Sequence, residues 1–419
     1  MPSPYRAIFA APGTRAFTVA GFFGRLPLSM LGIGIVTMIS QLTGRYGLAG
    51  ALTATLALSA AVLGPQVSRL VDQYGQRRVL RPAVLISVAA VTGLLVSARE
   101  GAPDWVLFAF TACAGAVPSA GAMLRARWAA LYRDSPDRLH TAYSFESVMD
   151  EVCFIVGPIA SIGLSTVWFP EAGPLIATVS LLIGLFWLTA QRATEPVPHP
   201  REPGADRSSA LRAPGLQVLV ATFVATGAIF GSVDVVTVAF AEERGNQAAA
   251  SVVLAVWALG SCIAGLLFGL VRLKGRKERT WVLGICAMAV SMIPLLLAGN
   301  LPFLAVALFV AGLAIAPTMV TTMALIETHV PRAKLTEGMT WVGTGLAVGV
   351  ALGSSVAGWV IDAAGARSAF VVSISAGAAA AAVAFAGYRR LTRPALGEEP
   401  DGHAEQHEDG RRDDARHVA

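Results

Sequence analysis

The stretch that decides the fold is "ALSAAVLGPQVSRLVDQYGQRR", residues 57–78. Its first half is almost entirely apolar, and its second half is a short polar turn that ends in Arg77 and Arg78 before the next apolar run begins. A helix of roughly 18 to 25 apolar residues crosses the hydrocarbon core of a bilayer, which is about 30 Å thick. The stretch therefore indicates the end of a membrane-spanning helix followed by a basic loop.

The same pattern recurs along the whole chain. Of the 419 residues, 55% are hydrophobic and 14% are charged, against roughly 45 to 50% and about 25% in soluble proteins. Twelve apolar blocks can be delimited, at residues 17–40, 48–68, 79–98, 103–124, 143–168, 173–191, 214–240, 248–271, 281–299, 302–325, 335–361 and 369–388. No alternating strand pattern is present, so we predict an all-helical integral membrane protein with twelve spans. The first block is too long for a secretory signal and contains Arg25, which indicates a retained helix.

A polar segment divides the spans six and six. Residues 192–213 are rich in proline and charge, and residues 389–419 form a second charged segment without a periodic apolar face. We therefore predict an N-terminal six-helix bundle (1–191), a cytoplasmic linker (192–213), a C-terminal six-helix bundle (214–388) and a disordered cytoplasmic tail (389–419). A weak similarity between the halves suggests a duplicated six-helix unit.

The basic residues predict the orientation. If the twelve spans are numbered in order, 27 of the 32 Lys and Arg residues fall on the side that holds both termini. By the positive-inside rule, both termini are cytoplasmic in the cell membrane. The net charge of +5 follows from this topology and does not indicate nucleic acid. The four cysteines lie far apart within spans, without the spacing of a disulfide framework or a metal site.

The loop at residues 68–78 carries a family resemblance. Twelve spans, a linker after the sixth and this loop resemble the major facilitator superfamily, whose signature is Gly, three residues, Asp, a basic residue, any residue, Gly, any residue and two basic residues. The matching positions are Asp72, Gly75, Arg77 and Arg78, whereas Ser68 and Gln73 depart from the pattern. The resemblance covers about residues 15–390. It implies two six-helix bundles, with a substrate site between them near the middle of the membrane.

The loop residues also have a physical role of their own. Gly75 permits a sharp reversal, and Asp72 at a helix end can accept hydrogen bonds from a neighbouring helix N-terminus or pair with Arg77 or Arg78. The resemblance suggests that Asp72 and its basic neighbours gate the cytoplasmic side. The alternative is that the loop is simply a basic cytoplasmic turn.

Three carboxylates lie in "SFESVMDEVCFIVGP", residues 144–158. Asp150 and Glu151 fall near the middle of the fifth span, whereas Glu146 falls closer to the cytoplasmic boundary, and we group it with the gate. An ionised group at membrane depth needs a partner or a water-filled cavity. Arg25 in the first span lies at a comparable depth, so we predict that it pairs with Asp150 or Glu151. The pair either holds two helices together or includes a carboxylate that exchanges a proton.

Asp234 and several glycines complete the candidate residues. Asp234 lies near the outer end of the seventh span, where it either meets a cationic substrate, closes an outer gate or is an interfacial residue. Gly157 and Pro158 partly resemble the fifth-span motif of drug antiporters, although the fourth-span Arg expected in many of them is missing, since that span has no charge before Arg125. Close helix packing is predicted at Gly265, Gly269, Gly345, Gly349 and Gly353. We expect the halves to rock against each other along spans 2, 5, 8 and 11.

No enzyme signature is present. The sequence contains no phosphate-binding loop, HExxH or GxSxG motif, so we expect neither an enzyme nor a cofactor. We predict a monomeric secondary transporter that works by alternating access, with the lipid bilayer, protons and a small molecule as partners. Export of an amphipathic drug or secondary metabolite against protons is favoured by an expected apolar lining of Phe22, Phe23, Phe110, Phe223 and Phe230. The alternatives are uptake of a polar metabolite by proton symport, and a receptor or scaffold that does not transport.

Overall fold

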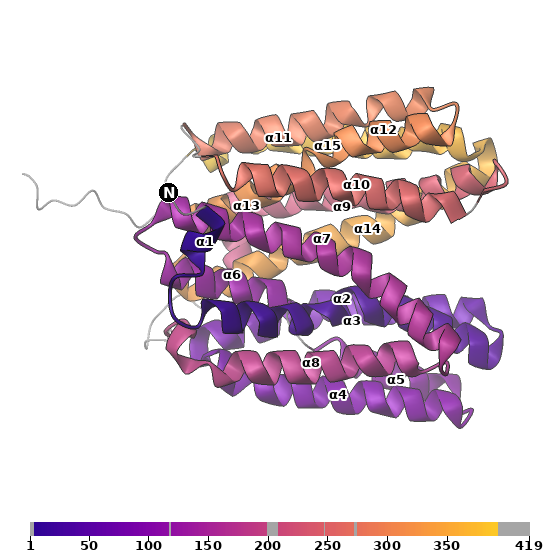
Figure 1. The fold of residues 1–419 in the computed structure, drawn as a ribbon, viewed down its shortest axis with the longest axis horizontal. Coiled ribbons are helices and arrows are strands. Elements are labelled where there is room, and N and C mark those ends of the chain that lie inside the picture. The colour runs from indigo at the N-terminus through magenta and orange to yellow at the C-terminus, as the bar shows by residue number, and fades with distance from the viewer. Residues whose placement is uncertain (1–3, 117–118, 199–207, 247, 272–274, 393–419) are drawn as a thin grey trace, which may run out of the picture.

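The computed structural model describes residues 4–116, 119–198, 208–246, 248–271 and 275–392. Within these ranges the chain is helical, and its long helices lie side by side in an elongated bundle (Figure 1). Eleven segments are long and apolar enough to cross a membrane, and the helix Asp104–Ala114 is a shorter apolar one. These segments correspond in order to the twelve predicted spans, and the all-helical fold class is confirmed.

The first half of the bundle is built from seven long or medium helices that follow the short helix α1 (Pro4–Ile8). They are α2 (Thr14–Thr43), α3 (Tyr46–Tyr74), α4 (Gln76–Arg99), α5 (Asp104–Ala114), α6 (Ala120–Leu131), α7 (Pro136–Val167) and α8 (Ala172–Ala190). The fourth span consists of two pieces, α5 and α6, and continues to Leu131. The predicted limit at residue 124 was therefore too short.

The second half repeats this arrangement. Its elements are α9 (Pro214–Glu242), α10 (Ala248–Phe268), α11 (Lys277–Ser291) with the 3₁₀ turn η3 (Ile293–Leu297), α12 (Leu301–Gly312), α13 (Ile315–His329), the 3₁₀ turn η4 (Arg332–Lys334), α14 (Leu335–Ala364) and α15 (Ala366–Leu391). The tenth span, like the fourth, is made of two helices, α12 and α13. The last span continues three residues beyond the predicted limit at 388, and residues 393–419 of the predicted tail lie outside the described residues.

The two ends of the bundle differ in how the halves meet. We call the end that holds α1, the linker and the end of α15 the linker end, and the opposite one the loop end (Figure 1). At the linker end one apolar core joins both halves, with Trp128 and Tyr143 from the first and Trp281 and Val320 from the second. At the loop end each half has a core of its own. Within the described residues, the core that the two halves share lies at the linker end.

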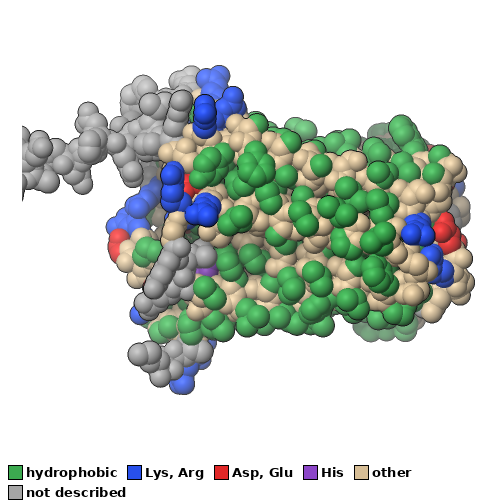
Figure 2. Space-filling view, turned by 90° about the horizontal axis from the view of Figure 1, so that it is seen from above, with side chains coloured by type: hydrophobic (Ala, Val, Ile, Leu, Met, Phe, Trp, Pro, Cys, Tyr) green, Lys and Arg blue, Asp and Glu red, His purple; other side chains and the backbone are tan. Residues whose placement is uncertain are grey.

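The surface agrees with a position in a membrane. Figure 2 shows hydrophobic side chains over the middle of the molecule, with most Lys and Arg side chains of this face gathered at the linker end. Large apolar side chains such as Leu58, Val62 and Trp359 are more than half exposed in the absence of lipid. A soluble monomeric protein rarely exposes so broad an apolar surface, and such a surface marks a site of contact with a membrane or another protein.

Both ends of the predicted linker are attached to the bundle. The buried side chain of Arg127 donates to Thr194 Oγ1 (2.7 Å) and to the carbonyl oxygens of Gln191 (3.0 Å) and Leu188 (2.9 Å). Thr194 ends the 3₁₀ turn η1 (Arg192–Thr194), and a second turn, η2 (Ala210–Arg212), precedes α9. Residues 199–207 of the predicted linker lie outside the described residues.

Candidate functional site

A network of four charged side chains lies inside the first half. Arg25 of α2 forms an ion pair with Glu146 of α7, and its Nε lies 3.2 Å from Asp150 Oδ1. Arg125 of α6 pairs with the other oxygen of Asp150. Three of the four residues are at least nine-tenths buried, whereas Asp150 remains 28% exposed. Two guanidinium groups thus balance two carboxylates, and one of these carboxylates is open to solvent.

The helix geometry explains why these groups meet. Glu146 and Asp150 are one turn apart on α7, so both side chains project from the same face toward α2 and α6. Trp128 Nε1, three residues after Arg125 on α6, donates to Glu146 Oε1 at 2.7 Å. Buried charges are tolerated when each is paired and hydrogen-bonded. The network therefore fixes α2, α6 and α7 relative to one another.

The structure corrects the predicted position of Glu146. It was grouped with the cytoplasmic gate, but its side chain is fully buried and contacts Arg25 and Trp128 within the first half. The reason is that α7 begins at Pro136, so Glu146 lies ten residues, or about 15 Å, along the helix. Of the two partners predicted for Arg25, the structure shows Asp150.

Arg125 is a member of the network that the sequence analysis missed. It was placed beyond the end of the fourth span, whereas α6 continues past it and buries it. The fourth span therefore does carry a buried Arg, in its second piece α6. A signal was available, because "AGAMLRARWAAL" contains no proline, has only good or moderate helix formers after Gly121, and carries Trp128 close to both arginines.

Glu151 contacts the other half of the molecule. Ser261 of α10 donates to Glu151 Oε1 at 2.7 Å. Among the described residues, no Arg, Lys or His lies within ion-pair distance of this carboxylate, whereas Asp150 and Asp234 are close enough for their negative charges to act on it. Asp150 and Glu151 are adjacent in sequence, yet one is paired within its own half and the other spans the two halves.

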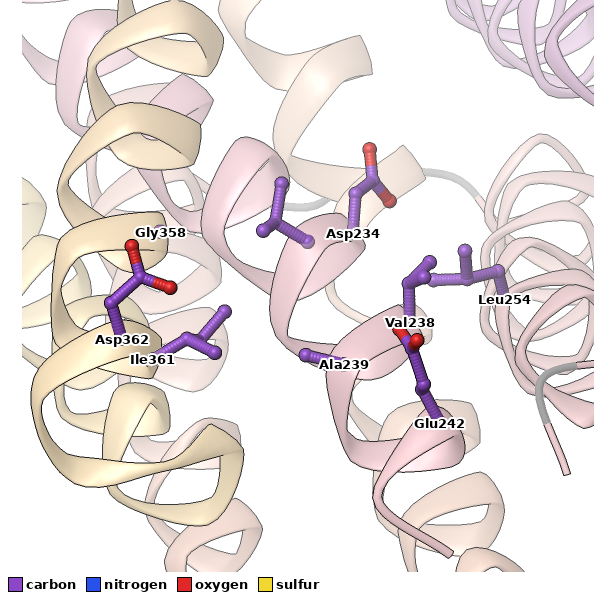
Figure 3. A pocket seen from close by; sticks show the side chains of 9 residues that line it. Asp234, Val238, Ala239, Glu242, Leu254, Gly358, Ile361 and Asp362 are labelled. Atoms are coloured by element: carbon purple, nitrogen blue, oxygen red, sulfur yellow. The ribbon is translucent and has the colours of Figure 1, made fainter. Parts of the chain in front are cut away.

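Asp234 lines an open pocket of about 470 Å³ at the loop end, between α9, α10 and α14. Figure 3 shows the carboxylates of Asp234, Glu242 and Asp362 around it, together with apolar side chains such as Leu254 and Ile361. In the described part of the chain these three carboxylates form no ion pair.

The two arginines of the second half at this end are engaged elsewhere. Arg244 stacks on the ring of Phe240 and donates to the carbonyl oxygens of Phe240 and Gly299. Arg367 donates to the carbonyl oxygen of Leu296 at 2.9 Å. Neither arginine neutralises the carboxylates of the pocket, so its polar lining is acidic.

Asp72 joins the two halves at the linker end. Its carboxylate accepts hydrogen bonds from the backbone N–H groups of Thr336 (3.3 Å) and Glu337 (3.0 Å), at the start of α14. This is the predicted contact with a neighbouring helix N-terminus, where a negative charge also meets the positive end of the helix dipole. Ser68, the departure from the family signature, hydrogen-bonds Thr340 at 2.8 Å. The departure thus adds a contact between the halves.

The rest of the loop contacts the linker. Gly75 has a φ of 91°, as the predicted reversal requires. The backbone N–H of Arg77 donates to Glu195 Oε1 at 2.8 Å. The described residues show no ion pair between Asp72 and the side chain of Arg77 or Arg78, so the alternative pairing proposed for Asp72 is wrong.

A second set of contacts joins α7 to the second half. His140 Nε2 lies 2.8 Å from the carbonyl oxygen of Phe268, and Thr141 Oγ1 donates to the carbonyl oxygen of Gly269 at 2.9 Å. Tyr143 donates to the carboxylate of Glu327 on α13. Together with Asp72, these groups close the linker end.

The predicted packing glycines fall into two groups. A Cβ at Gly265 would lie 3.0 Å from Val148 Cγ2, and one at Gly269 would lie 2.8 Å from Ser144 Cβ, so both glycines lie where the halves meet. Gly157 beside Pro158 packs within the first half, against Ser29.

The three glycines of α14 do not lie on the surface along which the halves were expected to rock. A Cβ at Gly345, Gly349 or Gly353 would approach a backbone carbonyl oxygen of α9 to 2.9, 1.9 or 2.2 Å, respectively. This packing lies inside the second half. The expected apolar lining is also wrong in part, because Phe223 is 1% exposed in the core and Phe110 packs against Gly93.

The sequence matches the model of the Major Facilitator Superfamily over residues 17–270 and 218–410. No curated protein sequence matches the chain.

Solved structures with the same fold include the human organic anion transporter MFSD10 (TETRAN) and a bacterial homologue of the iron transporter ferroportin in the outward-facing state. The first is 16% identical, with a TM-score of 0.65, and the alignment covers 91% of this chain and 100% of the other. The second is also 16% identical, with a TM-score of 0.72 and coverage of 90% and 100%. The same homologue soaked with iron gives 16% identity, a TM-score of 0.70 and coverage of 91% and 99%.

Proposed function

The chain belongs to the Major Facilitator Superfamily, a family of membrane transporters, and we propose that it exports small amphipathic molecules from the cell in exchange for protons. The observation that carries the proposal is the position of Glu151. This carboxylate lies beside a balanced charge network, has no cationic partner among the described residues, and bonds Ser261 across the two halves. The charge of such a group depends on whether it carries a proton, and its hydrogen bond to Ser261 depends on the relative position of the halves.

The proposed orientation indicates on which side of the membrane the molecule is open. The linker end collects most of the Lys and Arg residues, so we assign it to the cytoplasm. The halves are packed at that end and have separate cores at the loop end, which then faces outward. In alternating access the same halves close at the loop end and open at the linker end, and the substrate site lies between them.

The proton is assigned to Glu151 and not to Asp150. Asp150 is flanked by Arg25 and Arg125, whose two positive charges balance its own charge and that of Glu146. Glu151 has only a hydroxyl partner, Ser261, in the described structure. Because an unpaired charge at membrane depth is costly, a proton is the simplest neutralising partner for Glu151 when the halves close around it.

The pocket of the second half, which we propose as part of the substrate path, has a lining that favours a positively charged substrate with an apolar body. Asp234, Glu242 and Asp362 supply negative charge, and Val238, Leu254 and Ile361 supply apolar surface. An organic anion, the substrate named for the human structural relative, is disfavoured by these carboxylates. Iron is disfavoured because the described residues contain no group of three His, Cys, Asp or Glu side chains able to hold a metal ion.

The test is substrate-dependent proton movement in vesicles that contain the purified protein. A panel of amphipathic cations is added on one side, and the internal pH is followed with a fluorescent dye. We expect at least one compound to drive proton movement with the unaltered protein and with Glu100→Gln, an exposed residue of the loop end. Glu151→Gln, at equal protein level, is expected to abolish the movement.

Two results would contradict the proposal. Proton coupling that persists in Glu151→Gln at equal protein level would remove this carboxylate from the mechanism. Higher accumulation of the compound in cells that carry the gene, compared with cells that lack it, would indicate uptake in place of export.

A further inference from the structure

The residues before the first span pack against the first half of the molecule. We call Tyr5–Phe9 the N-terminal clasp. The side chain of Ile8 is fully buried in the core of the linker end, and its carbonyl oxygen accepts a hydrogen bond from Tyr132 at 2.6 Å. Phe9 packs edge to face on Trp128 and Phe145, with ring centroids 6.1 and 5.2 Å apart. The C-terminal part of the clasp is therefore fixed on α6 and α7.

The other end of the clasp reaches the second half. Tyr5 donates its hydroxyl hydrogen to the carbonyl oxygen of Leu266 at 2.8 Å and lies 3.2 Å from that of Gly265, both in the last turn of α10. The last carbonyl groups of a helix lack partners within the helix and need an external donor. Burial raises the pKa of Tyr5 to about 12, so the hydroxyl keeps its proton at physiological pH.

Gly269 provides the space for this contact. A Cβ at that position would lie 2.3 Å from the Tyr5 hydroxyl oxygen and 2.8 Å from Ser144 Cβ. The site therefore combines a donor from the N-terminal segment, acceptors at the end of α10 and a glycine that lets the two approach. It is separate from Asp72, which acts on α14.

We propose that the N-terminal clasp holds the linker end closed and has to release α10 before that end can open. The proposal rests on the alternating access of the proposed function. Ile8 and Phe9 remain with the first half, and only two residues lie between Tyr5 and Ile8, so the hydroxyl cannot follow α10 when the halves separate. The bonds to Gly265 and Leu266 therefore exist in the closed state only, and they shift the equilibrium toward it.

The size of the effect follows from the number of bonds. One neutral hydrogen bond changes an equilibrium by about 2- to 10-fold. Removing the hydroxyl should therefore raise the ratio of open to closed linker ends by about this factor, because Asp72, Thr141 and Tyr143 still hold the halves together.

The test measures the opening directly. In a protein whose four cysteines are replaced, spin labels are attached at Asp134→Cys and Arg279→Cys, two exposed positions at the linker end, one in each half. The distance distribution between the labels is recorded by electron–electron double resonance in lipid nanodiscs. Tyr5→Phe is expected to increase the population at long distance by about 2- to 10-fold. Tyr74→Phe, an exposed tyrosine without a hydrogen bond in the described structure, is expected to leave it unchanged.

Gly269→Ala is a less selective variant, because the added methyl group would meet Ser144 Cβ of α7 as well as the Tyr5 hydroxyl. An increase at long distance in Tyr5→Phe supports the clasp, and an unchanged distribution in Tyr5→Phe overturns it, whatever the effect of Gly269→Ala. The measurement needs no transported compound. Failure of the export proposal would appear as an absence of substrate-dependent proton movement, while the label distances still respond to Tyr5→Phe.

Discussion

Each half has a pair of helices that form its first and fifth membrane spans. This pair is α2 and α7 in the first half, and α9 and α14 in the second. The first pair is joined by charge. Arg25 of α2 contacts Glu146 and Asp150 of α7, and Arg125 adds a second cation. One of these carboxylates, Asp150, is partly open to solvent.

The second pair is joined by close backbone contact. Gly345, Gly349 and Gly353 form a ridge along α14 that lies directly on backbone carbonyl oxygens of α9. The described residues show no ion pair between these two helices. Small residues at such positions let helix backbones approach closely, which favours dispersion contacts and fixes the distance between the helices.

The two halves therefore differ in how their corresponding helices are held together. Charged side chains can change partners without a change in backbone position, whereas a glycine ridge in contact with carbonyl groups fixes the distance between its two helices. We infer that the charge network of the first half can rearrange its pairing and that the spacing of α9 and α14 is fixed in the second half.

Removal of Arg25, the central cation of the first half, is expected to have the largest effect on stability. Arg25→Met leaves Glu146 and Asp150 with Arg125 as their only cation. Breaking a buried ion pair by removing one partner costs about 3–5 kcal/mol. We expect the largest loss of thermal stability here, measured as the unfolding temperature of the purified protein in detergent.

A double variant identifies the cause of that loss. Arg25→Met combined with Glu146→Gln removes the uncompensated charge, so part of the stability should return. An equal loss in the single and the double variant would mean that lost packing, and not charge, explains the effect.

The glycine ridge gives a smaller loss. Gly349→Ala places a Cβ 1.9 Å from the carbonyl oxygen of Val224, so α9 and α14 must separate. Overpacking of this kind costs about 1–3 kcal/mol. Gly343→Ala is the matched control on the same helix, because its Cβ meets nothing within 4 Å and alanine is the better helix former. Equal unfolding temperatures for the two variants would contradict the rigid contact.

The smallest effects are expected at the linker end, where the halves cap each other's helices. Asp72→Ala removes the cap of α14, which is worth about 0.5–2 kcal/mol for an acidic cap. Thr141→Val removes one neutral hydrogen bond to α10, worth about 0.5–1.5 kcal/mol. With spin labels across the linker end, both variants should favour the open state, and Asp72→Ala the more. The reverse order would mean that α10 carries the closure.

The fold could be predicted from the sequence because the spans depend on composition alone. Length and hydropathy of each block place the helices, and the polar segment after residue 191 divides them. The interruption of the fourth span could not be placed in this way, since its apolar composition continues across it. That one error moved Arg125 out of the membrane region and hid its pairing with Asp150.

The site was predicted less completely because pairing depends on the rotation and depth of neighbouring helices. The sequence predicted a buried pair with Arg25 and a helix N-terminus for Asp72, and both contacts are present. It did not indicate that Glu146 would be the second partner of Arg25. The starting point of α7 decides that depth, and Pro136 at the first turn of the helix is the residue that marks it.

The attachment of the linker has a practical consequence. On one side Arg127 and Arg77 hold Thr194 and Glu195 to the first half, and on the other side Glu337 accepts hydrogen bonds from Ser209 and from the backbone of Ala210 in the second. Each half thus holds the adjacent end of the linker by hydrogen bonds of its own. A fluorescent protein inserted between these two anchored points would report expression and location while leaving the carrier intact.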